Sequence, residues 1–183
     1  MEVYDFKEAR RYAMQLGLQA SLFWIGSFLL FAYTFPSFLS ELSMLIGLAS
    51  AWYVGMKVKR RRQEDRALNG LRCWSLTWLT FICTVLLTTI VQYFYFAVLD
   101  GGMMLAKLDQ MFSSPQIVEL YRQSQATDML ELLQVSIHEM QSLTVRELMM
   151  SFMTTNLLLG FIFSLLSLLC IIGTKAGQKR RNV

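Results

Sequence analysis

The chain has 183 residues, of which 55% are hydrophobic and 16% are charged, and its mean hydropathy is +0.42. This length suits one domain, but the excess of apolar residues excludes an ordinary soluble domain and indicates a membrane protein. The formal net charge of +4 does not indicate nucleic-acid binding, because the basic residues flank hydrophobic segments instead of covering one solvated face.

Two apolar segments near the N-terminus, Ala13–Phe35 and Phe38–Met56, are long enough to cross a bilayer. A hydrocarbon core of ~30 Å takes about 20 apolar residues in a helix. Pro36 separates the segments, and Glu41 in the first turn of the second suits both the water interface and the helix dipole. The first segment is too long for the apolar core of a signal peptide, so we expect it to remain attached.

A basic run, Lys57 to Arg72, follows the second segment and holds seven of the 17 Lys and Arg residues. We expect it to fix the topology and to attract anionic lipid headgroups, at about 1 kcal/mol for each basic residue near the surface. The residues to which this role is assigned are Lys59, Arg60, Arg61 and Arg62.

Two further spans are predicted at Cys73–Leu99 and Leu148–Gly173, and both carry rows of polar residues at steps of three or four. In lipid, such rows hydrogen-bond across helix interfaces, and small residues such as Gly17 and Gly55 let helices approach closely. The side chains expected to bond between helices are Gln15, Gln19, Thr84, Thr88, Gln92 and Asn156.

The segment 100–144 between these spans is expected to form an amphipathic helical hairpin. Gly101 and Gly102 should end the third span, and Pro115 should begin a helix that stops near Gln125. A second helix should start at Thr127, with an apolar face made of Met129, Leu130, Leu133, Ile137 and Met140. The hairpin would rest on the outer leaflet or cap the bundle, and would be either a lid over the helix ends or a binding surface for a partner or a lipid.

Thr144 and Glu147 match a capping box that should begin the fourth span at Val145. Four spans place 14 of the 17 basic residues on one side, so the positive-inside rule predicts that both termini are cytoplasmic. The predicted fold is an all-α integral membrane protein with one four-helix domain over residues 1–183 and an extracytoplasmic insertion at 100–144.

No motif for catalysis, a metal or a cofactor emerges. The single histidine, His138, precedes Glu139, but Ser142 stands where a zinc-binding H-E-x-x-H motif needs its second histidine. No phosphate-binding loop is present, and Cys73, Cys83 and Cys170 show no metal-binding spacing. No charged residue occupies the middle of a span, which argues against an active transporter.

Four stretches resemble a known family: RYAMQLGL at Arg11–Leu18, YFYFAVLD at Tyr93–Asp100, SPQIVEL at Ser114–Leu120, and the fourth span with Asn156, Gly160 and Ser164. They are similar to the domain of unknown function 4199 family of bacterial four-span membrane proteins. The resemblance covers nearly the whole chain. It implies the fold, a bacterial cytoplasmic membrane, and an accessory role in envelope glycan assembly beside a polyprenyl-phosphate glycosyltransferase.

The expected function is therefore that of a non-enzymatic accessory or scaffold subunit that binds a membrane partner. One alternative is a small transporter or lipid-handling channel that uses the polar row around Thr84, Thr88, Gln92 and Asn156. The other is an enzyme acting on lipid headgroups at the outer interface, with Asp100, Asp109, His138 or Glu139 as candidate groups.

Overall fold

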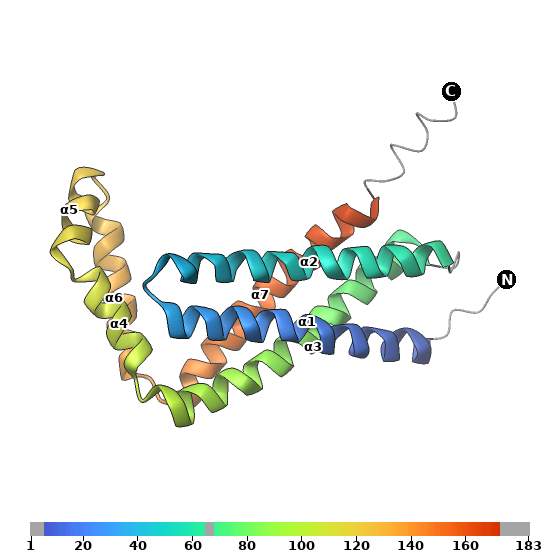
Figure 1. Ribbon diagram of the computed structural model, residues 1–183, viewed down its shortest axis with the longest axis horizontal. Helices are drawn as coiled ribbons and strands as arrows, with labels where there is room; N and C mark the ends of the chain where they lie inside the picture. Colours follow the sequence, from blue (N-terminus) through green and yellow to red (C-terminus); the bar gives the residue numbers. More distant parts are fainter. Residues whose placement is uncertain (1–5, 65–67, 173–183) are drawn as a thin grey trace.

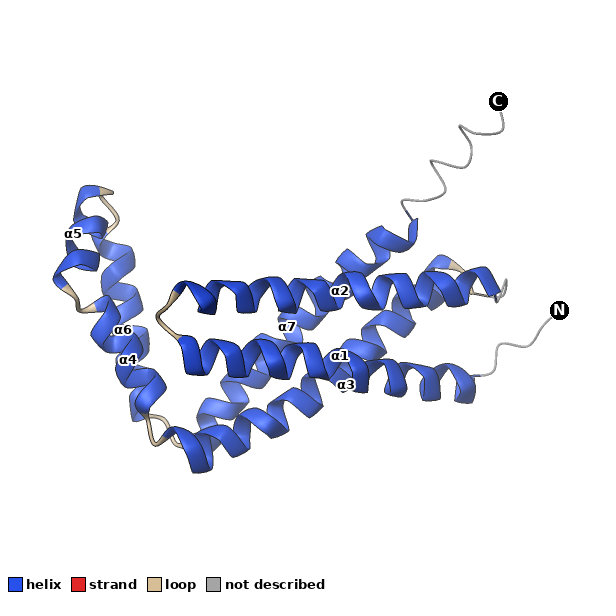
Figure 2. Cartoon of the chain, in the orientation of Figure 1, coloured by secondary structure: helices blue, strands red, loops and turns tan. Residues whose placement is uncertain are grey.

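The computed structural model describes residues 6–64 and 68–172, and these residues form only helices (Figures 1 and 2). Seven α-helices and one π-helical segment follow each other: α1 Phe6–Thr34, α2 Phe38–Glu64, α3 Gly70–Phe94, η1 Tyr95–Asp100, α4 Met103–Phe112, α5 Pro115–Gln123, α6 Thr127–Ser142 and α7 Val145–Ile172.

Four of these helices are long and apolar enough to cross a membrane: α1, α2, α3 with η1, and α7. The four predicted spans are confirmed as helices of this kind, but all four begin or end beyond the predicted limits. In α2 the difference is greatest, because the helix continues from Met56 through the basic run to Glu64. The predicted end of the fourth span, Gly173, lies outside the described residues.

The four long helices form a bundle in which α1 and α7 each contact both α2 and α3. In Figure 1, α1 and α2 lie side by side, and α3 and α7 pass behind them at an oblique angle. The start of α1, the end of α2 and the start of α3 lie at one end of the bundle, which we call the basic end. Helices α4 to α6 lie at the opposite end.

Two groups of buried side chains hold the bundle together. The larger includes Trp24 of α1, Val54 of α2, and Phe81 and Val85 of α3. The smaller lies toward α4 and joins Ala32, Tyr95, Phe96, Met104 and Met149. The rings of Phe28 and Tyr95 meet edge to face at 5.2 Å between centroids, an arrangement that aromatic pairs prefer.

Small residues let the helices approach each other closely. A Cβ atom added to Gly17 of α1 would lie 2.7 Å from the Cβ of Cys83 and 2.9 Å from the backbone oxygen of Thr80, both on α3. A Cβ atom on Gly55 of α2 would lie 3.1 Å from the backbone oxygen of Ser167 on α7. These two predicted small-residue positions therefore lie at helix contacts.

The third span ends where predicted. After η1, Gly101 and Gly102 have positive φ angles of 52° and 84°, which residues with a side chain rarely adopt, and the chain turns into α4. The Asp100 side chain accepts hydrogen bonds from the backbone N–H groups of Gly102 and Met104, at 3.1 and 3.0 Å. It thereby satisfies N–H groups at the start of α4.

Three helices, where two were expected, form the segment between the third and fourth spans. Helices α5 and α6 correspond to the predicted hairpin, and α4 is additional. Gln134 of α6 donates a hydrogen bond to the backbone oxygen of Phe112 at the end of α4, at 3.0 Å. Figure 1 shows α4 and α6 side by side across the end of the bundle, with their axes steeply inclined to α1 and α2.

The predicted capping box at the start of α7 is confirmed. The backbone N–H and the hydroxyl of Thr144 both donate to Glu147 Oε2, at 2.9 and 2.7 Å. The backbone N–H of Glu147 in turn donates to Thr144 Oγ1 at 3.4 Å. The helix begins at Val145, the predicted position.

Candidate functional site

A groove of about 520 Å³ lies between the four long helices in the half of the bundle nearer α4. Its volume is within the roughly 300–1,000 Å³ that is usual for ligand sites. The lining is largely apolar and aromatic, with Trp24 and Phe28 from α1, and Phe152 and Phe163 from α7. Met44 and Leu48 of α2 and Leu159 of α7 line the groove but are exposed, so it opens between α2 and α7.

An amide pair forms part of the wall of this groove. Asn156 Nδ2 of α7 donates a hydrogen bond to Gln92 Oε1 of α3 at 2.9 Å. Asn156 is 9% exposed and Gln92 6%, so the pair is largely removed from solvent. Both residues belong to the predicted interhelical set, and they join two helices whose starts are far apart in the chain.

Thr88 lines the same groove one helical turn before Gln92. It is 1% exposed, and its hydroxyl has no hydrogen-bond partner among the described residues. An unsatisfied buried polar group costs about 1–3 kcal/mol. Thr84, one turn before Thr88 in α3, differs because its hydroxyl has partners. It donates to the backbone oxygens of Gly17 on α1 and of Thr80, at 3.2 and 3.0 Å.

The two glutamines predicted on α1 differ in their surroundings. Tyr53 of α2 donates its hydroxyl hydrogen to Gln19 Oε1 at 2.8 Å, so Gln19 joins α1 to α2. Gln15 is exposed and makes no hydrogen bond within the described ranges. Two further interhelical bonds involve residues outside the predicted set: Trp24 Nε1 donates to Ser50 Oγ at 2.9 Å, and Ser167 Oγ donates to the backbone oxygen of Ala51 at 2.8 Å.

A family model described as protein of unknown function (DUF4199) matches residues 15–169, which cover α2 and α3 whole and most of α1 and α7. The chain belongs to this family. The resemblance found in the sequence is thereby confirmed. No curated protein and no solved structure matches the chain.

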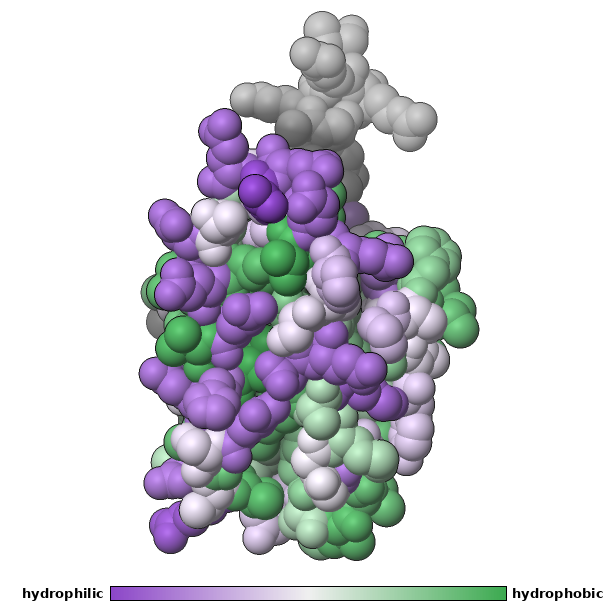
Figure 3. Space-filling view, turned by 90° about the vertical axis from the view of Figure 1, so that its left-hand side faces the viewer, coloured by the Kyte–Doolittle hydropathy of each residue, from purple (hydrophilic) through white to green (hydrophobic). Residues whose placement is uncertain are grey.

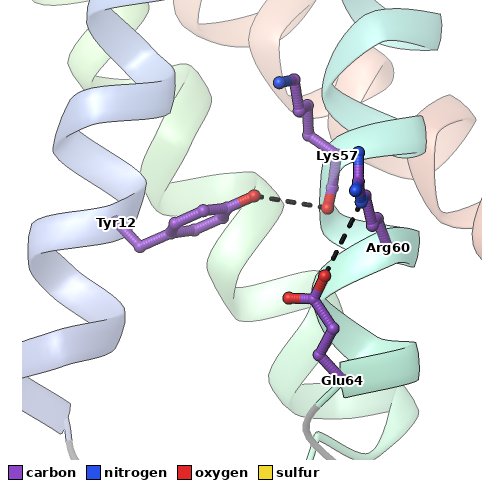
Figure 4. Close-up of polar contacts among 4 residues, drawn as sticks. All are labelled: Tyr12, Lys57, Arg60 and Glu64. Atoms are coloured by element: carbon purple, nitrogen blue, oxygen red, sulfur yellow. Dashed lines mark hydrogen bonds and ion pairs between the residues drawn. The ribbon is translucent and has the colours of Figure 1, made fainter.

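At the basic end of this DUF4199 protein, α1 is tied to α2 by polar contacts. The Tyr12 hydroxyl donates to the backbone oxygen of Lys57 at 3.3 Å (Figure 4). The Arg61 guanidinium lies 4.7 Å from the centroid of the Tyr12 ring and pairs with Glu8. Arg61 therefore contributes to helix packing as well as to charge, since an arginine over an aromatic face is attracted to it.

The other residues of the predicted basic set face outward to different degrees. Arg60 pairs with Glu64 one turn away at 3.6 Å, and its side chain is 80% exposed (Figure 4). Such an exposed pair contributes little stability. Lys59 and Arg62 are partly buried. Lys59 and Arg60 line a surface hollow of about 490 Å³ together with Trp52 and Tyr53.

Helices α4 to α6 of the DUF4199 chain expose apolar side chains outside the four spans. Helix α5 buries none of its residues, and its apolar residues Val118 and Leu120, which project from different sides of the helix, are both exposed. On α6, Leu130 and Ile137 are buried, whereas Met129, predicted on the same face, is exposed together with Leu132 and Val135. Figure 3 shows the side of the molecule on which these helices lie: mostly hydrophilic, with hydrophobic residues between.

The groups considered for interfacial catalysis are spread over the α4 end. Asp100 is buried, and its carboxylate caps α4. Asp109, His138 and Glu139 are exposed on α4 and α6. Within the described residues, no three His, Cys, Asp or Glu side chains gather as a metal site would require.

Proposed function

We propose that this protein is a non-enzymatic, multi-pass subunit of the bacterial cytoplasmic membrane that assembles with a protein partner through α5 and α6. The observation that carries this proposal is the exposure of apolar side chains on both helices. Helix α5 buries no side chain, and α6 presents Met129, Leu132 and Val135 on the side away from Leu130 and Ile137. Exposed apolar groups rimmed by polar residues are typical of protein interfaces.

The charge of this segment favours a protein over a lipid surface as the occupant. Residues 100–144 contain six acidic residues, Asp100, Asp109, Glu119, Asp128, Glu131 and Glu139, and two basic ones, Lys107 and Arg122. Helices that lie on membranes are usually rich in Lys and Arg, because anionic headgroups attract them. An acidic segment is repelled by such headgroups but complements a partner protein with a basic rim.

The distribution of basic residues supports an orientation with the basic end in the cytoplasm. Lys59 to Arg62 lie beyond the apolar part of α2, at the end opposite α4 to α6. Several residues that contribute to the charge count lie outside the described residues: Arg66, Lys175, Lys179, Arg180 and Arg181. In this orientation α4 to α6 face the envelope. The first partner we propose to test is the glycosyltransferase of envelope glycan assembly that the family resemblance implies.

Site-specific photocrosslinking in native membranes tests the proposal. A photoreactive residue at Leu132 of α6 should capture one defined protein, and the same protein should be captured from Leu120 of α5. A photoreactive residue at Leu158 of α7 is the matched control: its side chain is 63% exposed, against 68% for Leu132, but it lies within a span and should capture lipid.

Substitutions then separate specific assembly from chance capture. Leu132→Glu should abolish co-purification of the captured protein without changing the melting temperature, because Leu132 is exposed. Gln141→Glu, at another exposed position of α6, should preserve it. Lipid adducts alone at Leu132, or a partner that survives Leu132→Glu, would contradict the proposal.

A further inference from the structure

The groove between the long helices has unused hydrogen-bonding groups on one wall only. Ser27 and Ser43 on the α1–α2 side donate to backbone oxygens, at 2.6 and 2.5 Å, and Thr155 of α7 donates to its own helix at 3.2 Å. Thr88, in contrast, has no partner within the described residues.

Next to Thr88, the Gln92–Asn156 pair shares a single hydrogen bond. A primary amide offers two N–H donors and one carbonyl acceptor. One N–H of Asn156 and both N–H groups of Gln92 therefore have no partner among the described residues. Thr88, Gln92 and Asn156 all line the groove, so their unused hydrogen-bonding groups lie beside it.

The depth of these groups restricts what that oxygen can belong to. Asn156 lies 11 residues after the first residue of α7, or about 16 Å along the helix at ~1.5 Å per residue. This places it well inside the apolar span. Among the described residues, no Asp, Glu, Lys, Arg or His lines the groove, so these residues offer no counter-charge to an ionised group at this depth.

The remaining surface of the groove suits a hydrocarbon chain or an apolar ring. Aromatic side chains line it from Trp24 to Phe31 on α1 and from Phe152 to Phe163 on α7. It opens beside the exposed residues Met44, Leu48 and Leu159 on two candidate spans. A molecule dissolved in the bilayer can therefore enter sideways without crossing water.

We propose that the groove binds an uncharged membrane lipid whose carbonyl or hydroxyl oxygen accepts hydrogen bonds from Thr88 and Asn156. The apolar part of the lipid lies against the aromatic rings. Lipids with this chemistry include diacylglycerols and isoprenoid quinones. This inference does not depend on the partner proposed for α5 and α6, because the groove lies within the bundle.

Photolabelling of the full-length protein in vesicles tests the inference. Three photoreactive probes are compared: a diacylglycerol, an isoprenoid quinone and the anionic lipid phosphatidylglycerol. At least one neutral probe should label peptides that line the groove, and Thr88→Val should weaken its binding about three- to tenfold, the effect of one lost hydrogen bond. Comparison of the two neutral probes shows which class of neutral lipid supplies the oxygen that Thr88 and Asn156 bind.

Thr155→Val is the matched control, because it makes the same change in the same groove but removes a hydroxyl that already bonds to its own helix. It should leave labelling unchanged. Thr88→Val should not lower the melting temperature, since its hydroxyl has no protein partner to lose. If Thr88 had a purely structural role, Thr88→Val would lower the melting temperature.

A second variant, Gly47→Leu, blocks the groove from α2. An added Cβ atom there meets only Ser27 Oγ, at 3.8 Å, so the leucine side chain has room and should prevent labelling by neutral lipid. Three results would each overturn the inference. Phosphatidylglycerol could label the groove as strongly as the neutral probes, labelling could be unaffected by Thr88→Val and Gly47→Leu, or no groove peptide could be labelled. Leu132→Glu should leave neutral-lipid labelling unchanged.

Discussion

Gly17 lies where α1 and α3 approach each other without room for a side chain. A methyl group there would overlap the Cβ of Cys83 and the backbone oxygen of Thr80, and backbone cannot rotate away as a flexible side chain can. We expect Gly17→Ala to destabilise the protein by about 1–3 kcal/mol through overpacking. Unfolding in mixed detergent micelles measures this loss.

Gly26→Ala is the control for that measurement. It changes the same residue type in the same helix, but a Cβ atom at Gly26 has no neighbour within 4 Å. Because alanine favours a helix over glycine, this variant should be as stable as the parent protein or slightly more stable. Equal stability of the Gly17 and Gly26 variants would show that α1 and α3 do not meet as described.

The Gln92–Asn156 pair is the second residue-level feature that can be measured. Gln92→Leu and Asn156→Leu should each destabilise the protein, whereas the double variant should lose less than the sum. A double-mutant cycle should give a coupling energy of roughly 0.6–2 kcal/mol, the range for such bonds in membranes. Effects that add within about 0.5 kcal/mol would mean that the two amides do not interact.

Periodic polar rows identified the helix faces but not their partners. Thr84, Gln92 and Asn156 do bond between helices, because each lies on a face that another helix covers. Gln15 and Gln19 lie four residues apart and both are exposed, yet among the described residues only Gln19 bonds to a neighbouring helix, through Tyr53. The hydrogen-bond partner of a side chain depends on which helices are neighbours and on how they are shifted along their axes. The spacing of residues within one helix gives neither. Ser167 bonds to a backbone oxygen, which no side-chain pattern reveals.

Helix ends were predicted well where the sequence contains a recognisable capping motif. The Thr144–Glu147 box fixed the start of α7, and Gly101 and Gly102 fixed the end of the third span. Helix α4 was missed because its ten residues directly follow these glycines and are too few to show a clear period. The extension of α2 to Glu64 was missed because charge marks the limit of a membrane span, not of a helix.

Asp100 is expected to hold α4 in place through its two backbone hydrogen bonds. Asp100→Ala removes both acceptors and should destabilise the start of α4 by about 1 kcal/mol, the usual value of a cap. Hydrogen exchange should then be faster at the amides from Met104 onward, with α1 unchanged. Asp109→Ala, at an exposed carboxylate of α4, is the control, and equal exchange in both variants would contradict the capping role.

The oblique crossing of the helices explains why the bundle has both a tight contact and a groove. Helices α2 and α7 are close where Gly55 meets Ser167, toward the basic end. Further along, Met44 and Leu48 of α2 and Leu159 of α7 are separated by the groove. Two straight helices that cross at an angle touch over a limited length. The small residues therefore fix the place of contact, and the groove lies beyond it.

The proposed orientation of the whole molecule rests on the imbalance of charge between its two ends. The topology predicted from the sequence assigns 14 of the 17 basic residues to the side of the Lys57–Arg72 run, and Lys107, Arg122 and Arg146 to the other. Positive residues near short loops resist transfer across the membrane, so that side should stay in the cytoplasm.

A single cysteine at Arg62 should then react only with a reagent that enters the cytoplasm. A cysteine at Ser113, between α4 and α5, should react with an impermeant reagent added outside. Both are placed in a protein whose Cys73, Cys83 and Cys170 are replaced by alanine. Labelling of both positions from the same side would contradict the four-span orientation, because α3 would then not separate them.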